Sequence, residues 1–275
     1  MEKLFYLVLA LVLLLAFFHF FRGPEIEQKS IKVSGAWALY PMMVKWAEEY
    51  QKLNPDVRVD VSAGGAGKGM ADALSGLVDM GMVSRDIDPS EVQKGAYAVK
   101  VVKDAVIPAV NKNNPVANEI SEKGLKKNQF KDMFLYNNLT KWGDAVGNSE
   151  VSTKIMVYVR SDSCGAGEVW AKYLGVKQED LKGIGIYGDP GIAEAVSKDK
   201  NGIGFNNLNF AYDSNTGLPV GDLMMVPIDL NENGVVDEDE NFYLEKQDMI
   251  NAIATGKYPS PPARDLYIVT KTVFR

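Results

Sequence analysis

The chain has 275 residues, of which 46% are hydrophobic and 24% are charged, an ordinary composition for a folded protein with room for two lobes. The formal net charge of −6 argues against nucleic-acid binding, although a small anion needs only local donors. The only cysteine is Cys164 and the only histidine is His19. An intrachain disulfide is therefore excluded, and Ser-His, Cys-His and His-metal chemistry is excluded beyond the first 22 residues. We expect neither an enzyme nor an organic cofactor.

An apolar segment opens the chain. Residues 4–21 are apolar apart from Tyr6 and His19, with Lys3 before them and Arg22 after them. This length is at the lower edge of a membrane span and exceeds the apolar core of a usual signal peptide, which has about 7–15 residues. Because no small-residue cleavage site follows, we predict an uncleaved signal-anchor over residues 1–22 and a tether over residues 23–30. The charges of Lys3 and Arg22 are too balanced to fix the orientation of this segment. The expectation that the rest of the chain is extracytoplasmic and held at the cell membrane, or secreted if the segment is cleaved, therefore depends mainly on the family resemblance given below.

Strands and helices alternate along the remaining residues. Hydrophobic periodicity predicts strands at 30–34, 57–61, 78–83, 100–110, 155–159 and 202–205, and helices at 39–53, 70–76, 128–134, 168–174 and 192–198. Such alternation indicates an α/β fold with mostly parallel pairing, in which ligands bind at the carboxyl ends of strands. We place chain crossings between two lobes after residue 108 and near residue 204. Lobe 1 would then hold residues 31–108 and 204–275, and lobe 2 residues 109–203.

Polar or glycine-rich turns follow three of these strands. They are the glycine turn from Gly64 to Gly69, the pair Ser84 and Arg85, and the stretch from Arg160 to Gly167. Glycine turns at helix starts present free backbone N–H groups to an anion, and arginine adds a permanent charge. A glycine turn can equally serve close packing, and Arg85 can pair with a surface carboxylate.

Cys164 has two possible roles in the last of these turns. A thiol beside Arg160 and a helix start can have a lowered pKa and react. We favour the simpler interpretation, a small donor within a tight turn.

A calcium-type loop lies between residues 229 and 240. It matches the pattern D-x-[DN]-x-[DN]-G-x5-E in full, which predicts a structural Ca²⁺ site over a solvated acidic turn. No strong helix precedes it, so a paired helix–loop–helix sensor is not expected. The predicted ligands supply side-chain oxygens except for one backbone carbonyl, that of Val235: Asp229, Asn231, Asn233, Val235, Asp237 and Glu240.

Several stretches, in order, resemble the phosphate-binding proteins of ABC importers. The resemblance covers Ser34–Tyr50, Gly64–Gly69, Asp79–Arg85, Asn138–Trp142, Arg160–Gly167 and Pro261–Tyr267. It implies a two-lobed periplasmic-binding-protein-like fold, with two strand crossings as a hinge and the ligand in a cleft between the lobes. Carried over by position, the anion contacts are Ala36, Trp37, Gly67, Lys68, Ser84, Arg85, Arg160, Cys164, Gly165 and Ala166.

The site departs from the family pattern. Hydroxyl residues that many relatives carry are replaced here by Trp37, Ala66, Cys164 and Ala166. Arg85 stands where some relatives have an aspartate that accepts the proton of bound phosphate, and replacing that acceptor by an arginine would favour a fully deprotonated dianion.

Three functions follow from these observations. The first is a monomeric, membrane-tethered solute-binding protein that delivers phosphate to the permease of an ABC importer. The second keeps the fold and binds another oxyanion: sulfate, arsenate, molybdate or tungstate. The third is a calcium-stabilised surface or sensor domain with no role in transport.

Overall fold

The computed structural model describes residues 29–272 of the chain. The predicted membrane anchor and all but the end of the tether lie outside these residues. Within residues 29–272, none of the helices combines the length and the apolar character needed to cross a membrane.

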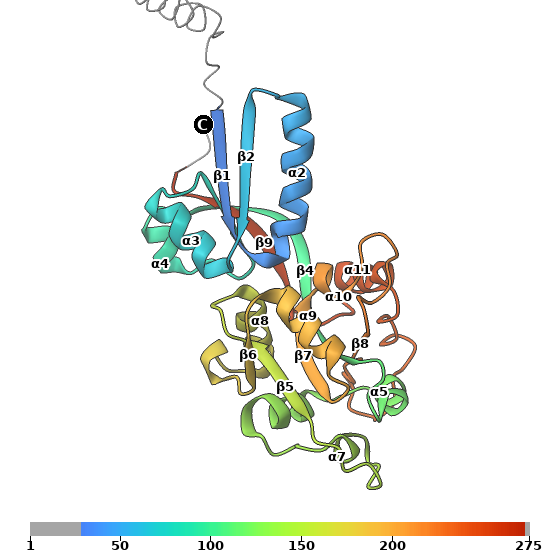
Figure 1. The fold of residues 1–275 in the computed structure, drawn as a ribbon. Coiled ribbons are helices and arrows are strands. Elements are labelled where there is room, and N and C mark those ends of the chain that lie inside the picture. The colour runs from blue at the N-terminus through green and yellow to red at the C-terminus, as the bar shows by residue number, and fades with distance from the viewer. Residues whose placement is uncertain (1–28, 273–275) are drawn as a thin grey trace, which may run out of the picture.

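The described chain folds into two lobes joined by long strands (Figure 1). Lobe 1 has three parallel strands, β1 (Lys29–Gly35), β2 (Val57–Ala63) and β3 (Met80–Val83), with β1 in the middle. Its helices are α2 (Tyr40–Leu53), α3 (Ala66–Ser75) and α4 (Pro89–Gln93), and a short 3-10 turn, η1 (Trp37–Leu39), precedes α2.

Two antiparallel strands cross between the lobes (Figure 1). They are β4 (Tyr97–Asn111) and β9 (Ala263–Thr270), and they pair from Tyr97 opposite Thr270 to Ala105 opposite Ala263. Strand β9 also pairs with β3 in lobe 1, while the far half of β4 pairs with β7 (Gly202–Asn207) in lobe 2. The sheet therefore continues through the hinge in the order β2-β1-β3-β9-β4-β7-β5-β6, with β8 also on β4.

Lobe 2 contains the remaining elements. Its other strands are β5 (Met156–Arg160), β6 (Ile184–Ile186) and β8 (Leu223–Met225). Its helices and helical turns surround them: α5 (Ala117–Lys123), α6 (Lys127–Lys131), η2 (Asp132–Tyr136), α7 (Trp142–Val146), α8 (Gly165–Leu174), η3 (Gln178–Asp180), α9 (Gly188–Lys198), α10 (Leu208–Ala211) and α11 (Lys246–Thr255).

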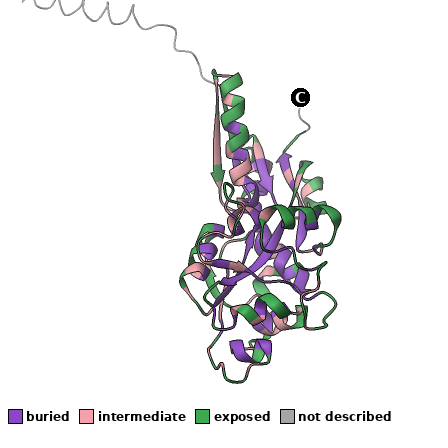
Figure 2. Cartoon of the chain, turned by 90° about the vertical axis from the view of Figure 1, so that its right-hand side faces the viewer, coloured by how far each residue is buried: buried purple, intermediate pink, exposed green. Residues whose placement is uncertain are grey.

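Each lobe has its own hydrophobic core, to which both strands and helices contribute buried residues (Figure 2). The larger core runs from Ala105 to Ala263 and includes the fully buried Trp142 and Trp170. The smaller core combines residues from Val33 to Ala96 with Leu266, Ile268 and Val269 of β9. Lobe 1 is therefore residues 29–104 and 264–272, and lobe 2 is residues 105–263.

The predicted return crossing near residue 204 is wrong. Residues 202–207 form β7, which pairs with β4 and β5 inside lobe 2, and the chain returns to lobe 1 only at β9. The calcium-type loop consequently belongs to lobe 2. The first crossing, between Asp104 and Ala105, lies close to the predicted position.

Candidate functional site

The two lobes touch at the ends of β3 and β5. A Cβ atom built on Gly165 would lie 2.1 Å from Ser84 Oγ and 2.3 Å from the Ser84 carbonyl oxygen. A Cβ built on Gly65 would lie 2.4 Å from the Ser163 carbonyl oxygen. Only glycine allows both approaches, so the cleft is closed in this structure.

Two helices begin at this contact, one from each lobe. Helix α3 starts after Gly65, whose φ of 93° suits glycine, and its first N–H groups belong to Ala66, Gly67 and Lys68. Helix α8 starts after Cys164, so the N–H groups of Gly165 and Ala166 also lack partners within their helix. Both predicted glycine turns therefore bring unpaired donors and positive helix ends to the same cleft.

Of the two predicted anion contacts before α2, Ala36 and Trp37, the first is already hydrogen-bonded within lobe 1. The N–H of Ala36 donates to the Met82 carbonyl at 2.9 Å, so this donor is already used inside lobe 1 and does not face an anion. Trp37 begins the 3-10 turn and its own N–H has no intrahelical acceptor. The indole of Trp37 contacts Tyr187 and Phe210 of lobe 2, with its ring centroid 6.0 and 6.3 Å from theirs.

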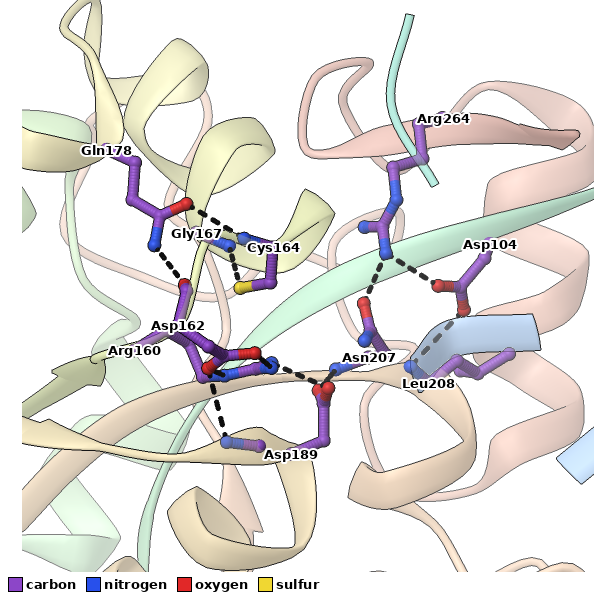
Figure 3. Close-up of polar contacts among 11 residues, drawn as sticks. Asp104, Arg160, Asp162, Cys164, Gly167, Gln178, Asp189, Asn207, Leu208 and Arg264 are labelled. Atoms are coloured by element: carbon purple, nitrogen blue, oxygen red, sulfur yellow. Dashed lines mark hydrogen bonds and ion pairs between the residues drawn. The ribbon is translucent and has the colours of Figure 1, made fainter. Parts of the chain in front are cut away.

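Arg160 is buried and ion-paired within its own lobe (Figure 3). Its Nε and Nη2 donate to the two carboxylate oxygens of Asp162 at 2.8 and 2.6 Å, and its Nη1 donates to Asp189 Oδ2 at 2.6 Å. Burial alone would lower the pKa of Arg160, but the two carboxylates raise it, so the guanidinium stays charged. Three of its five N–H groups are engaged, which leaves two for a ligand.

The other two predicted cations are also neutralised. Arg85 binds both oxygens of Glu91, with Nη1 at 2.9 Å and Nη2 at 2.7 Å, and its Nε lies 3.1 Å from Glu168 Oε2 across the cleft. Lys68 pairs with Asp72 on α3. That these side chains contact an anion stays a prediction. The carboxylates that pair with Arg85 are those of Glu91 and Glu168, not those of Asp86 or Asp88, although Arg85 Nη1 also donates to the Asp86 carbonyl at 2.9 Å.

Comparison with known proteins agrees with this architecture. Residues 23–273 match the family model described as "PBP superfamily domain". The chain belongs to the PBP superfamily. Three curated relatives are "Phosphate-binding protein PstS 2" of Streptococcus agalactiae (32% identical over 44% of this chain), and "Phosphate-binding protein PstS" of Xylella fastidiosa (28% over 70%) and of Bacillus subtilis (25% over 86%). The matches span 39%, 57% and 69% of those relatives' lengths, so this chain matches only part of each relative.

Solved structures show the same two-lobed fold. One is a putative phosphate ABC transporter substrate-binding protein from Clostridium perfringens, determined with bound phosphate (TM-score 0.69, 23% identity, 88% of this chain and 86% of that one). Another is an ABC-type phosphate transport receptor from Vibrio cholerae (TM-score 0.61, 19% identity, 89% and 88%).

A second buried arginine, missed at the level of sequence, lies at the hinge. Arg264 Nη2 donates to Asp104 Oδ2 at 3.1 Å and contacts Asn207 Oδ1, so the two crossing strands are bonded to each other and to β7 (Figure 3). Its Nε and Nη1 are buried and have no partner within the described residues. Burial raises the pKa of Asp104 to about 6 and lowers that of Arg264. Arg264 stands in the C-terminal motif of the family resemblance, which was the available signal.

Cys164 caps α8 from a buried position. Its Sγ accepts the N–H of Gly167 at 3.3 Å, and its own N–H donates to Gln178 Oε1 at 3.2 Å. Burial raises the pKa of the thiol to about 12. The simpler interpretation of Cys164, a small group in a tight turn, fits this position, because such a thiol is almost wholly protonated near neutral pH.

A cavity of about 580 Å³ opens beside this site, between the lobes. Its walls combine Arg85 of lobe 1, Glu168 and Lys172 of α8, and Arg264 of β9. Lys172 Nζ reaches Asp86 across it at 2.6 Å. Ion pairs between the lobes therefore line the approach to the closed cleft.

The predicted calcium residues lie elsewhere, in a loop of lobe 2. Asp229 and Glu240, at the two ends of the pattern, are buried, while Asn231, Asn233 and Val235 are exposed and Asp237 is half-buried. This loop shares no residue with the closed cleft.

Proposed function

We propose that this chain is an extracytoplasmic solute-binding protein that captures phosphate and delivers it to an ABC importer. The observation that carries the proposal is that the N-termini of α3 and α8, one from each lobe, lie at the same contact between the lobes: Gly165 of α8 meets Ser84, just after β3, and Gly65, just before α3, meets Ser163. Aligned N–H groups and two helix dipoles make a seat for a tetrahedral oxyanion. The names of the curated relatives and of the similar structures point the same way.

Backbone donors would carry most of the recognition. Hydrogen bonds to a charged group contribute about 1.5–3 kcal/mol each, so four or five N–H groups together with Ser84 suffice for micromolar binding. The two remaining N–H groups of Arg160 and the unpaired Nε and Nη1 of Arg264 add positive charge close by. Because these N–H donors come from both lobes, the anion can be held by all of them only when the lobes are closed. Capture of the anion is therefore coupled to closure of the lobes.

Phosphate is favoured over a fully deprotonated ion by the carboxylates beside Arg160. Asp162 and Asp189 both lie within hydrogen-bond distance of that guanidinium. Their negative charge disfavours an anion without a proton, whereas a protonated phosphate oxygen can donate to a carboxylate. Arg85 no longer argues for such a dianion, because Glu91 and Glu168 hold its side chain.

A binding role without turnover fits the groups available. The thiol of Cys164, at the start of α8, is buried, and burial raises its pKa to about 12. A covalent mechanism needs a nucleophile activated by an adjacent base or by a lowered pKa. We therefore infer that the bound anion leaves the cleft unchanged.

Calorimetry with the purified full chain tests this function. We expect phosphate to bind with a dissociation constant of 10 µM or less at pH 7, in the range set by several charge-assisted hydrogen bonds. Sulfate should bind at least tenfold more weakly at the same pH. If sulfate, molybdate or tungstate bound more tightly than phosphate, that ion would be the transported solute instead. If none of these anions bound, a surface or sensor domain without a role in transport would be favoured. Delivery to an importer predicts slower phosphate uptake by cells that lack the chain.

A further inference from the structure

The loop from Asp229 to Glu240 is fastened to the core of lobe 2 at both ends. Ile228, just before it, is buried and its N–H donates to Tyr243 Oη at 3.1 Å. Phe242 and Tyr243, just after it, are buried and stack on each other with ring centroids 4.7 Å apart. The loop also contacts the segment after α5, because the N–H of Asp229 donates to the Leu125 carbonyl at 3.1 Å. Anything that orders the loop therefore acts on the lobe as a whole.

The backbone of the loop folds back around its first residue. Glu232 and Gly234 have φ values of 62° and 83°, which turn the chain sharply. The N–H of Gly234 then reaches Asp229 Oδ2 at 2.8 Å, and the N–H of Leu230 reaches Glu240 Oε1 at 2.8 Å. Two buried carboxylates, from the first and last positions of the pattern, are thus turned toward the inside of the loop.

One oxygen inside the loop has no partner. Asp229 is 1% exposed, and its Oδ1 is buried with no hydrogen-bond donor in the described residues. The nearby Lys126 Nζ lies 3.9 Å from the other oxygen, Oδ2, and also contacts the Glu232 carbonyl. A buried carboxylate oxygen without a donor is costly unless a cation meets it. We propose that the cation is Ca²⁺, bound by Asp229, Asn231, Asn233, the Val235 carbonyl, Asp237 and Glu240.

Calcium binding would require a small rearrangement. Within residues 29–272 no three Asp, Glu, His or Cys side chains are gathered as a metal cluster. In this loop Asp237 Oδ2 accepts the amides of Asn231 and Asn233 at 2.7 and 2.9 Å. The oxygens of these two amides accept backbone N–H groups and keep a second lone pair for a cation. Turning Asp237 from the amide nitrogens to the ion completes an all-oxygen set that suits Ca²⁺ better than Mg²⁺.

The site stabilises lobe 2 and leaves the anion cleft unaltered. Six acidic residues crowd this segment: Asp229, Glu232, Asp237, Glu238, Asp239 and Glu240. A divalent cation relieves their mutual repulsion. Because only three of the six proposed ligands carry a charge, we expect a dissociation constant of about 10⁻⁴–10⁻³ M, as in other extracellular calcium modules.

Thermal unfolding of the full chain, stripped of metal and titrated with CaCl₂ or MgCl₂, tests the proposal. At ten times the dissociation constant Ca²⁺ should raise Tm by about 3–6 °C, and Mg²⁺ at the same concentration by less than half as much. Glu240→Gln should weaken Ca²⁺ binding at least tenfold, while the matched change Glu238→Gln, at an exposed non-ligand position, should alter it less than threefold.

Three outcomes would overturn the proposal: equal effects of the two cations, equal losses in the two variants, or no shift in Tm. If Glu240→Gln fails to fold, Asn231→Ala replaces it, because Asn231 is exposed. The dissociation constant for phosphate, measured in EDTA, should not change in any of these variants. This readout separates the calcium site from the proposed function.

Discussion

Gly165→Ala tests closure of the cleft most selectively. The new Cβ would lie 2.1 Å from Ser84 Oγ and 2.3 Å from the Ser84 carbonyl oxygen. The distance to the Ser84 carbonyl oxygen is roughly 1 Å shorter than an ordinary contact. This oxygen belongs to the backbone, so it cannot move aside by a change of rotamer as a side-chain atom can. The lobes must therefore separate, and the N–H groups of Gly165 and Ala166 move away from the donors of lobe 1.

The expected loss of phosphate affinity follows from the two N–H donors that are displaced, those of Gly165 and Ala166. Two charge-assisted hydrogen bonds at about 1.5–3 kcal/mol each give at least 3 kcal/mol, so phosphate affinity should fall at least 100-fold. The fold itself should be retained, because Gly165 is the first residue of α8 and the clash is between lobes. Calorimetry with phosphate measures the loss, and the Tm of the ligand-free chain reports the fold.

Gly64→Ala is the matched control in the same cleft. Its Cβ would meet only the flexible side chain of Lys68, in its own lobe, at 2.5 Å. We expect its phosphate affinity to stay within threefold of the parent chain. Unchanged affinity in Gly165→Ala with an unchanged Tm would refute the idea that the closed cleft holds the anion, as would equal losses in the two variants. Arg160→Ala is a poorer test, since it leaves Asp162 and Asp189 buried without their cation, which commonly costs 3–5 kcal/mol of stability.

Three further predictions concern single groups of the site and the hinge. Ser84→Ala should weaken phosphate binding about tenfold with little change in Tm, because one hydrogen bond to a charged ligand is lost; unchanged affinity would remove Ser84 from the site. Cys164 should react with iodoacetamide at pH 8 at least 100-fold more slowly than a free thiol, since its pKa of about 12 and its burial suppress the thiolate, and fast labelling of the folded chain would contradict this. Burial raises the pKa of Asp104 to about 6, above its value in the unfolded chain. As the pH falls from 7 to 5 the folded state therefore takes up a proton before the unfolded state does, and the free energy of unfolding rises by about 1 kcal/mol. The same amount is lost when the pH rises again. Urea unfolding at both pH values should show that gain in the parent chain and not in Asp104→Asn; the same gain in the variant would assign it to other groups.

Much of the fold was readable from the sequence because its signals are local. The apolar runs before Gly35, Ala63 and Arg160 became strands β1, β2 and β5, and the glycine turns after the latter two became the N-termini of α3 and α8. The position of the return crossing was not readable. The pattern of residues 202–205 predicts a buried strand but does not say in which lobe, and only the pairing of β7 with β4 places this strand in lobe 2.

The site was predicted in position but not in its electrostatics. Asp162 is two residues from Arg160, whereas Asp189 reaches the same guanidinium from 29 residues away, through the start of α9. Glu91 and Glu168 reach Arg85 from two different lobes. Such pairings depend on how elements are placed in space, so a sequence pattern that finds a cation cannot tell whether the fold has already neutralised it.

The most direct test of the account is the binding of phosphate to the full chain and to Gly165→Ala, measured by calorimetry at pH 7. We predict a dissociation constant of 10 µM or less for the parent chain and a phosphate affinity at least 100-fold lower in the variant. No heat of binding at 1 mM phosphate in the parent chain, or equal affinity in the two proteins, would contradict it.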